Sequence, residues 1–318
     1  MNLTVNLIND DIFKRFVHLE KNGKLGHAYL FIGPSGIGKG ETALAIAKHF
    51  NGKQPDNQLF SMPGNSEKLI DAGQHPDVHV VDSAGETIKI EQVRELIHQE
   101  KLRPYMASTK IFIIKNAENL TLEASNALLK TLEEPSSNSL IILTTTAVDK
   151  MLDTIKSRCH YIYFHPLAQA QVVQTLLDTH AVNETQAHFL AYFSDGCVGK
   201  AKRLQESDLW AVKNKAIDAF ILSVNSDDYI KGVLADKETT AMFLDILLSW
   251  LRDAMLVKAN VNDDRLMHID RIKELRQFAS RFDFEQLNDV YQETVNTKKL
   301  LADNLNVKVS LMIIKESL

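Results

Sequence analysis

Cysteine is scarce in this chain of 318 residues, which has only Cys159 and Cys197. Two cysteines provide neither a disulfide framework nor the paired ligand spacing of a structural zinc site. The composition is therefore typical of a protein from a reducing compartment.

Long apolar segments are also missing. The longest, residues 243–257, covers fifteen positions and contains three charged residues, so it is too short and too polar to cross a bilayer. It predicts a buried helix instead. The amino terminus reaches Asp10 and Asp11 before any apolar run, and it lacks the basic start and hydrophobic centre of a secretory signal. We expect a cytoplasmic protein without a membrane partner.

An excess of basic residues is absent as well. The net charge is -5, and residues 1–165 hold 18 basic and 19 acidic side chains, which leaves 18 of the 36 basic and 22 of the 41 acidic ones to the remainder. Neither part is a basic platform for nucleic acid. Any contact with DNA must be local or shared with other subunits.

The first half of the sequence alternates apolar runs with segments of helical spacing. The predicted strands are residues 29–32, 78–81, 111–114 and 140–144, and the predicted helices are residues 42–50, 90–100 and 122–134. Thr121 is the expected N-cap of the last helix, which should end before Pro135. The polar residues 50–74 predict a loop or small insertion. This alternation predicts an α/β fold with a parallel sheet covered by helices.

The second half has no further strand signals after residues 164–166. Apolar residues recur at helical spacing to the end of the chain, and the glycines within residues 195–201 predict a helix end and a turn. We expect three domains: residues 1–165 with the sheet, residues 166–207 as a small helical domain, and residues 208–318 as a helix bundle.

Residues 33–39 have the sequence GPSGIGK, which is the spacing of a phosphate-binding P-loop. Chance alone would give two glycines and a lysine at this spacing in about one such chain in ten. An apolar strand before the loop and an alanine-rich helix after it favour a true P-loop. The helix amides could then hold phosphates while a lysine neutralises them. The candidate nucleotide-binding residues are Gly33, Gly36, Gly38 and Lys39.

The residues that would hold magnesium are missing. A P-loop ATPase uses a hydroxyl group directly after the lysine and an acidic residue at the end of a neighbouring strand. Here these positions are Gly40 and either Lys115 or Asn116. Asp82 also ends a strand and is an alternative carboxylate, although a solvated strand end is the simpler interpretation. We therefore expect no metal, no hydrolysis and at most weak ATP binding through Lys39 and the amides.

Four strings in the sequence carry a family resemblance. Residues 126–135 (NALLKTLEEP) and 157–159 (SRC) resemble clamp-loader ATPases of the AAA+ superfamily. Together with residues 27–31 (HAYLF) and 75–77 (HPD), they make the chain most similar to the delta-prime family of bacterial DNA polymerase III clamp loaders. The resemblance is strong up to about residue 205. It implies an AAA+ fold, with residues 166–207 as a lid and the remaining helices as an all-α collar for oligomerisation.

The resemblance also implies roles for single residues. Arg158 would be an arginine finger that reaches the ATP site of an adjacent motor subunit, with Ser157 and Cys159 shaping its turn. Such a finger can contribute about 10³ to 10⁵ in rate. Thr145 falls near the first sensor position of the family, although threonine is equally suited to a strand. At the second sensor position the family's arginine is missing, and Lys200 follows the turn.

Two further features follow from the resemblance. Many relatives carry a four-cysteine zinc module after the P-loop helix, whereas residues 51–74 contain no cysteine, so no zinc is expected. Residues 300–314 resemble the closing helix of the collar.

The implied function is that of a non-hydrolysing structural subunit that requires no cofactor. Its partners would be the gamma or tau motor subunits and the delta subunit, with the sliding clamp and primer-template DNA contacted through the complex. One alternative is an active motor of the gamma or tau type, against which Gly40, Lys115 and Asn116 argue. The other is a stand-alone P-loop protein that handles nucleic acid or small phosphorylated substrates.

Overall fold

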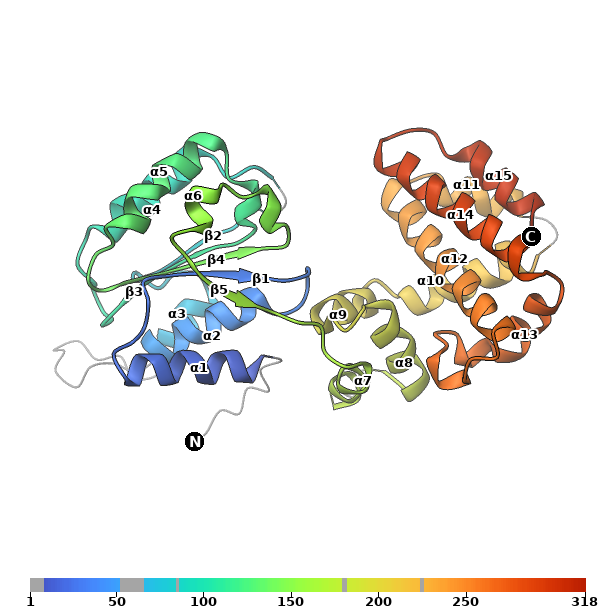
Figure 1. Cartoon of the computed structure of the whole chain (residues 1–318), viewed down its shortest axis with the longest axis horizontal. Helices are drawn as coiled ribbons and strands as arrows, with labels where there is room; N and C mark the ends of the chain where they lie inside the picture. Colours follow the sequence, from blue (N-terminus) through green and yellow to red (C-terminus); the bar gives the residue numbers. More distant parts are fainter. Residues whose placement is uncertain (1–8, 52–65, 84–85, 179–181, 224–225) are drawn as a thin grey trace. The chain divides into compact units, whose positions relative to one another are not determined.

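The computed structural model describes residues 9–51, 66–83, 86–178, 182–223 and 226–318. The chain divides into two compact units, Met1–Pro166 and Leu167–Leu318, and each is described by itself (Figure 1). We call them the sheet unit and the helical unit. The predicted further division near residue 207 stays a prediction.

The sheet unit is built on five parallel strands in the order β2-β3-β4-β1-β5. The strands are β1 (Ala28–Ile32), β2 (Val78–Val81), β3 (Lys110–Ile114), β4 (Ser139–Thr145) and β5 (His160–Tyr163). All four predicted strands are present, with ends that differ by one residue at most. Strand β5 was not predicted, because only Ile162 of its four residues is buried and no apolar run marks it.

Helices cover both faces of this sheet (Figure 1). They are α1 (Asp10–Lys21), α2 (Lys39–Asn51), α3 (Ser66–Asp71), α4 (Ile90–Glu100), α5 (Leu122–Glu133) and α6 (Asp153–Lys156), with short 3₁₀ turns at Ala117–Asn119 and Val148–Lys150. Apolar side chains of α4, α5 and α6 pack on one face. On the other face, the ring centre of Phe16 in α1 lies 4.6 Å from the ring centre of Tyr29 and 5.7 Å from that of Phe31. The predicted α/β fold is thereby confirmed.

Local sequence signals explain most helix boundaries. The hydroxyl oxygen of Thr121 accepts the N–H of Ala124 at 3.1 Å, so α5 begins at the predicted N-cap. It ends at Glu133, before Pro135 as expected. Part of the predicted loop of residues 50–74 is in fact helical, because α3 occupies Ser66–Asp71. Residues 52–65 of that loop lie outside the described residues.

Among its described residues the helical unit contains helices and turns only. The helices are α7 (Gln169–Asp178), α8 (Glu184–Phe193), α9 (Val198–Glu206), α10 (Leu209–Ala216), α11 (Asp227–Val233), α12 (Lys237–Lys258), α13 (Ile272–Ser280), α14 (Phe284–Ala302) and α15 (Lys308–Glu316). A π-helical turn at Ile217–Ile221 continues α10. The predicted turn at the glycines is present, since Asp195 and Gly196 have positive φ angles of 53° and 77°.

Two helix predictions in this unit have different outcomes. Residues 243–257 lie within α12 and contribute most of its buried residues, with Trp250 fully buried. The prediction of a single closing helix over residues 300–314 was wrong. The chain leaves α14 at Ala302, turns through Asn304 with a φ of 59°, and enters α15 at Lys308.

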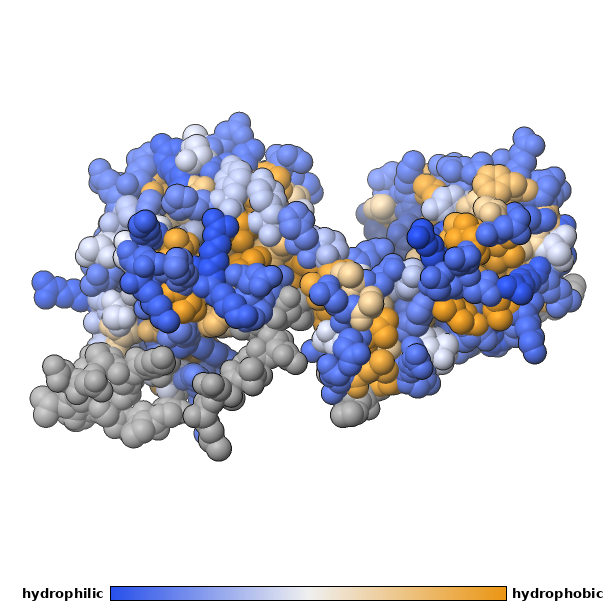
Figure 2. Space-filling model, turned by 60° about the horizontal axis from the view of Figure 1, so that its bottom comes forward, coloured by the Kyte–Doolittle hydropathy of each residue, from blue (hydrophilic) through white to orange (hydrophobic). Residues whose placement is uncertain are grey.

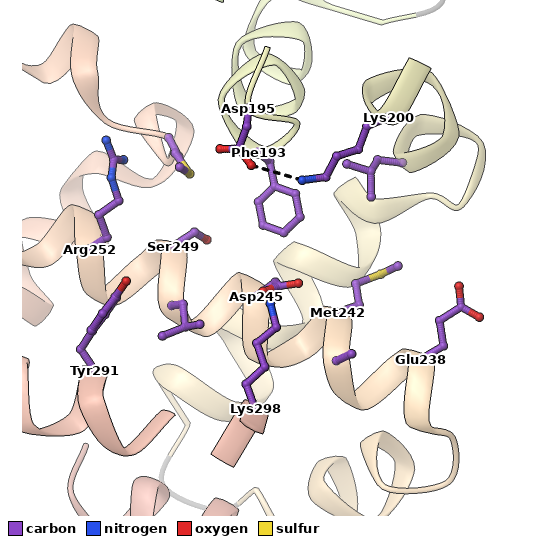
Figure 3. Close-up of a pocket in the computed structure, with 14 residues that line it drawn as sticks. Phe193, Asp195, Lys200, Glu238, Met242, Asp245, Ser249, Arg252, Tyr291 and Lys298 are labelled. Atoms are coloured by element: carbon purple, nitrogen blue, oxygen red, sulfur yellow. Dashed lines mark hydrogen bonds and ion pairs between the residues drawn. The ribbon is translucent and has the colours of Figure 1, made fainter. Parts of the chain in front are cut away.

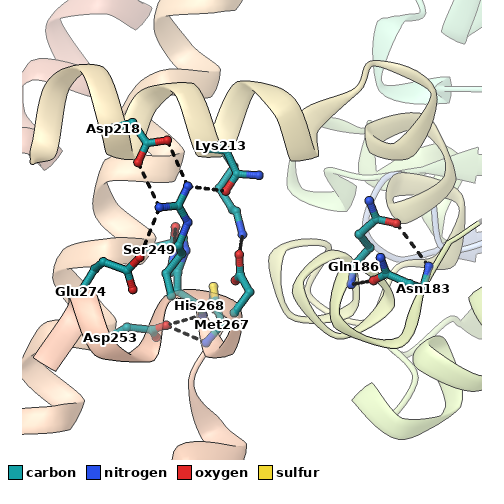
Figure 4. A network of polar contacts seen from close by, with 12 residues as sticks. Asn183, Gln186, Lys213, Asp218, Ser249, Asp253, Met267, His268 and Glu274 are labelled. Atoms are coloured by element: carbon teal, nitrogen blue, oxygen red, sulfur yellow. Dashed lines mark hydrogen bonds and ion pairs between the residues drawn. The ribbon is translucent and has the colours of Figure 1, made fainter.

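Buried polar groups connect the elements of the helical unit (Figure 4). Lys213 is fully buried, its Nζ lies 2.6 Å from an oxygen of Asp270, and its ammonium stands 3.5 Å from the ring centre of Trp210. Burial lowers the pKa of Lys213 to about 8. This contact fixes α10 against the segment before α13.

Hydrophilic residues cover most of the visible face of each unit, and hydrophobic residues form smaller patches between them (Figure 2). Within the described residues, each helix is too short or too polar to pass through a lipid bilayer.

Candidate functional site

The glycine-rich loop lies between β1 and α2, at the edge of the sheet where the parallel strands end. Gly33 has no room for a side chain, because an added Cβ would lie 2.7 Å from the carbonyl oxygen of Phe164. Gly38 has a φ of +100°, which favours glycine. The four predicted nucleotide-binding residues, Gly33, Gly36, Gly38 and Lys39, therefore belong to one loop that only glycine-rich sequences can form.

The ammonium group of Lys39 lies inside this loop. Its Nζ donates to the carbonyl oxygens of Gly33 at 2.6 Å and Pro34 at 2.8 Å, and 7% of the residue is exposed. Lys39 is also the first residue of α2, whose first-turn N–H groups have no partner within the helix. The loop thus places a cation beside a helix N-terminus, which is the arrangement that binds phosphate.

The next position, Gly40, faces the side chain of Lys115. An added Cβ at Gly40 would lie 3.5 Å from Cε and 3.9 Å from Cδ of Lys115. The Nζ of Lys115 forms an ion pair with Oδ2 of Asp82 at 3.1 Å. Magnesium does not fit these residues, because it requires oxygen ligands, Gly40 offers no side-chain oxygen, and Lys115 adds a positive charge.

Strand pairing explains how Asp82 and Lys115 come together. Val81 lies opposite Ile114 in the parallel register of β2 and β3, so the residues that follow both strands are neighbours. Asn116, the second residue after β3, has a φ of 53°, and its N–H donates to the hydroxyl of Thr144 at 3.2 Å. The alternative carboxylate, Asp82, is therefore a partner of Lys115.

Thr145, the candidate for the first sensor position, ends β4 beside the glycine loop. Its carbonyl oxygen accepts the N–H of Gly33 at 3.2 Å. Its hydroxyl accepts the N–H of Ala147 at 3.1 Å, and the residue is fully buried. The side chain stabilises its own turn, and a sensor role stays a prediction.

Arg158 follows α6 and is held by several contacts. Its Nη1 donates to the carbonyl oxygen of Thr154 at 2.8 Å and to the hydroxyl of Ser157 at 3.3 Å, and Nη2 pairs with Glu133 at the end of α5. Its Nε is buried without a hydrogen-bond partner among the described residues. About a third of the side chain, 32%, is exposed. The guanidinium is therefore positioned by α5 and α6, and part of the side chain stays exposed.

The neighbours of Arg158 shape its turn in different ways. The hydroxyl of Ser157 donates to the carbonyl oxygen of Thr154 at 3.2 Å. Cys159 packs against the apolar core of the sheet unit, and burial raises the pKa of its thiol to about 12. A thiol with this pKa is not a nucleophile near neutral pH. Cys159 therefore serves as a packing residue.

Arg158 and the glycine loop lie at opposite ends of the parallel strands. The loop follows β1, whereas Arg158 precedes β5, and these strands pair in parallel with Tyr29 opposite His160 and Ile32 opposite Tyr163. A strand rises about 3.3 Å per residue, so the four steps from His160 to Phe164 separate the two ends by roughly 13 Å. Arg158 therefore cannot serve the glycine loop of its own chain.

The helical unit contains a cavity of about 450 Å³ (Figure 3). Its walls come from α12, α14 and the turn between α8 and α9. Lys200, which follows the predicted second sensor position, lines the cavity and pairs with Asp195 at 3.3 Å. Lys298 and Asp245 form a second pair. Because these charges neutralise one another, the cavity does not have the character of a phosphate site.

The described residues contain no group of three or more His, Cys, Asp or Glu side chains suited to a metal ion. The expected absence of zinc concerns residues 51–74, of which residues 52–65 lie outside the described part. It stays a prediction.

Two contacts of the site were not predicted from the sequence. The first is the approach of Lys115 to Gly40, and the second is the pair between Arg158 and Glu133. Both join residues that are distant in the sequence. The position of Lys115 after a buried strand was the only signal for the first contact, and Glu133 within residues 126–135 was the only signal for the second.

The sheet with its glycine loop after β1, together with the helical unit, defines an AAA+-like P-loop protein. Two family models match the chain. The one described as DNA polymerase III, delta subunit matches residues 8–168, and the one described as DNA polymerase III, delta subunit, C terminal matches residues 207–316. The chain belongs to the delta-prime subunit family of DNA polymerase III.

Alignments with similar proteins cover most of the chain. DNA polymerase III subunit delta-prime of Bacillus subtilis is 30% identical over 96% of this chain and 94% of its own length. The subunit delta-prime of Escherichia coli is 25% identical, over 95% of this chain and 90% of its own length. DNA polymerase III subunit tau of Bacillus subtilis is 27% identical over 88% of this chain, but over only 44% of its own length.

Proposed function

We propose that this chain is a non-hydrolysing structural subunit of a DNA polymerase III clamp loader in the cytoplasm. It supplies Arg158 as a trans arginine finger to the ATP site of an adjacent motor subunit. The motor subunits are of the gamma or tau type, and a delta subunit completes the assembly. The complex then loads the sliding clamp onto primed DNA.

The observation that carries this proposal is the position of Arg158 relative to its own glycine loop. The two lie at opposite ends of the parallel strands, so a phosphate reached by Arg158 belongs to another molecule. An arginine that approaches a transferring phosphoryl group stabilises the charge of the transition state. The partly exposed guanidinium, held by Thr154 and Glu133, is positioned for such a contact.

The absence of hydrolysis by this chain has separate support. Gly40 provides no hydroxyl, and Lys115 stands beside it. ATP hydrolysis in P-loop proteins relies on a metal that neutralises charge between the phosphates and on a residue that orients water. At the positions of Gly40 and Lys115 neither role has a suited side chain, so we infer that the subunit acts through its neighbour.

The test is a reconstituted clamp loader with its motor subunits, sliding clamp and primed DNA. The Arg158→Ala variant should lower ATP turnover at the neighbouring site by about 10³, while assembly measured by gel filtration stays intact. Arg158→Lys keeps the charge but loses the planar fork, so it should restore little activity. The control is Arg94→Ala, which removes an exposed arginine of α4.

Two results would overturn the proposal. One is unchanged clamp-dependent turnover in the assembled Arg158→Ala complex. The other is brisk ATP hydrolysis by the purified chain alone, which would favour the motor alternative. Replacing Lys39 should have a much smaller effect on turnover than replacing Arg158.

A further inference from the structure

The contacts that hold Arg158 also occupy most of its guanidinium group. Nη1 has two N–H groups, and it donates to the carbonyl oxygen of Thr154 at 2.8 Å and to the hydroxyl of Ser157 at 3.3 Å. Nη2 pairs with a carboxylate oxygen of Glu133, and Nε is buried. Two parallel N–H groups are needed to bind a phosphate in the bidentate manner of arginine. Such binding requires that one of these contacts be replaced.

Glu133 is the anionic partner of Arg158 and comes from a different helix. It is the last residue of α5, and its side chain is 49% exposed. An acidic residue at the carboxyl end of a helix meets the negative end of the helix dipole, so the charge of Glu133 does not stabilise α5. The carboxylate is instead directed at the guanidinium, where another anion can take its place.

We propose that Glu133 is the counter-ion that holds Arg158 before it engages, and that the terminal phosphate of the neighbour's nucleotide displaces this carboxylate. The inference rests on the proposed function of Arg158 as a trans arginine finger, and it concerns the regulation of that contact. Glu133 is a positioning residue in this account, because it acts through Arg158 and does not touch the nucleotide.

The difference in charge favours the phosphate over the carboxylate. A terminal phosphate group carries up to about two negative charges and three acceptor oxygens, whereas Glu133 carries one charge. The side chains of Arg158 and Glu133 are 32% and 49% exposed, so water screens their ion pair, and exposed pairs contribute at most about fivefold to an equilibrium constant. A neighbour that holds a terminal phosphate can therefore release the arginine, while a neighbour without one leaves the pair closed.

The experiment measures clamp-dependent ATP turnover of the reconstituted clamp loader as the ATP concentration is varied. Glu133→Gln keeps the size of the side chain and an oxygen that can accept from Nη2, but it removes the charge. Because Arg158 no longer has to leave a carboxylate, kcat/KM for ATP should rise about threefold, and kcat should not fall. The control is Glu134→Gln, which makes the same change at the neighbouring exposed glutamate and should leave both constants unchanged.

A double variant shows whether Glu133 acts through Arg158. In a complex that already carries Arg158→Ala, the further change Glu133→Gln should have no effect on kcat/KM. The single variant Arg158→Ala remains the test of the finger itself, and unchanged turnover there would end the proposed function. Lowered turnover in Arg158→Ala together with unaltered constants in Glu133→Gln would end the present inference alone.

The ion pair can also be tested in the full-length chain without a neighbour. Phenylglyoxal reacts with guanidinium groups, and a closed ion pair slows this reaction. Modification of Arg158, followed by mass spectrometry of its peptide, should be about threefold faster in Glu133→Gln than in the original chain or in Glu134→Gln. Thermal unfolding verifies that each variant is folded.

Four results would overturn the inference. They are a lower kcat in the folded and assembled Glu133→Gln complex, an unchanged kcat/KM in that complex, a rise in kcat/KM that persists when Arg158 is alanine, and equal rates of phenylglyoxal modification with and without the charge of Glu133. The first of these is the result expected if the carboxylate only orients the arginine for the reaction.

Discussion

The buried carboxyl group of Asp253 gives the stability of the helical unit a specific pH dependence. Its Oδ2 accepts the N–H groups of Met267 at 2.6 Å and His268 at 2.9 Å (Figure 4), and its Oδ1 accepts from Arg252 at 2.9 Å. The residue is fully buried. Burial raises the pKa of Asp253 from 3.8 to about 6, against the opposing effect of these donors.

The sign of the effect follows from proton binding. The folded state holds the proton of Asp253 more tightly than the unfolded state, so this group stabilises the fold at low pH, and its contribution declines as pH rises through about 6. Between pH 5 and pH 7.5, a shift from 3.8 to about 6 corresponds to about 1.4 kcal/mol in the free energy of unfolding. The Asp253→Asn variant lacks this term, while its amide oxygen can still accept both N–H groups.

The assay is urea unfolding followed by tryptophan fluorescence. Both tryptophans of the chain, Trp210 and Trp250, lie in the helical unit, so the signal reports on that unit. The original chain should gain about 1.4 kcal/mol relative to Asp253→Asn between pH 7.5 and pH 5. Asp289→Asn, at an exposed position of α14, should show no such gain. A difference that is constant with pH, or larger at pH 7.5, would refute the reasoning.

Two other predictions concern the sheet unit. Asp77 is fully buried and accepts the N–H groups of Tyr105, Met106 and Ala107 at 2.6–2.9 Å, so Asp77→Ala should lower the free energy of unfolding by about 3 kcal/mol. A loss below about 1 kcal/mol in chemical denaturation followed by circular dichroism would contradict this account. Cys159, whose burial raises its pKa to about 12, should resist iodoacetamide at pH 8 until urea unfolds the chain. Mass spectrometry of the labelled protein would show this, and rapid labelling of folded protein would disprove it.

The sheet could be predicted from the sequence because its central strands are buried on both faces. Residues 111–114 and 140–144 are continuous apolar runs, and every residue of β3 and β4 is buried. The edge strand β5 could not be predicted, since Tyr161 and Tyr163 are exposed and the run is short. The break between α14 and α15 was also missed, because the helical periodicity continues through residues 303–307 and only the left-handed Asn304 interrupts it.

The candidate site was predicted in part for a similar reason. A P-loop is a local feature. The backbone conformations that require glycine lie within a few consecutive residues, so residues 33–39 were sufficient to identify the loop. The contact of Lys115 with the Gly40 position depends on the parallel pairing of β2, β3 and β4 and on the seating of α2. Likewise, Glu133 reaches Arg158 only because α5 and α6 pack on one face of the sheet. Single-sequence patterns contain no information on such distances.

The two ends of the sheet can therefore change independently of each other. Arg158 is positioned by Thr154, by Glu133 and by the core packing of Ile155, and none of these contacts involves Gly40 or Lys115. Replacing residues that follow β1 and β3, such as Gly40 and Lys115, does not change the packing at the amino ends of the strands. In such a fold, residues at one end of the strands can be replaced while the packing at the other end is unchanged. This separation gives a physical reason why a P-loop chain without magnesium ligands can retain an ordered arginine at the far end of its sheet.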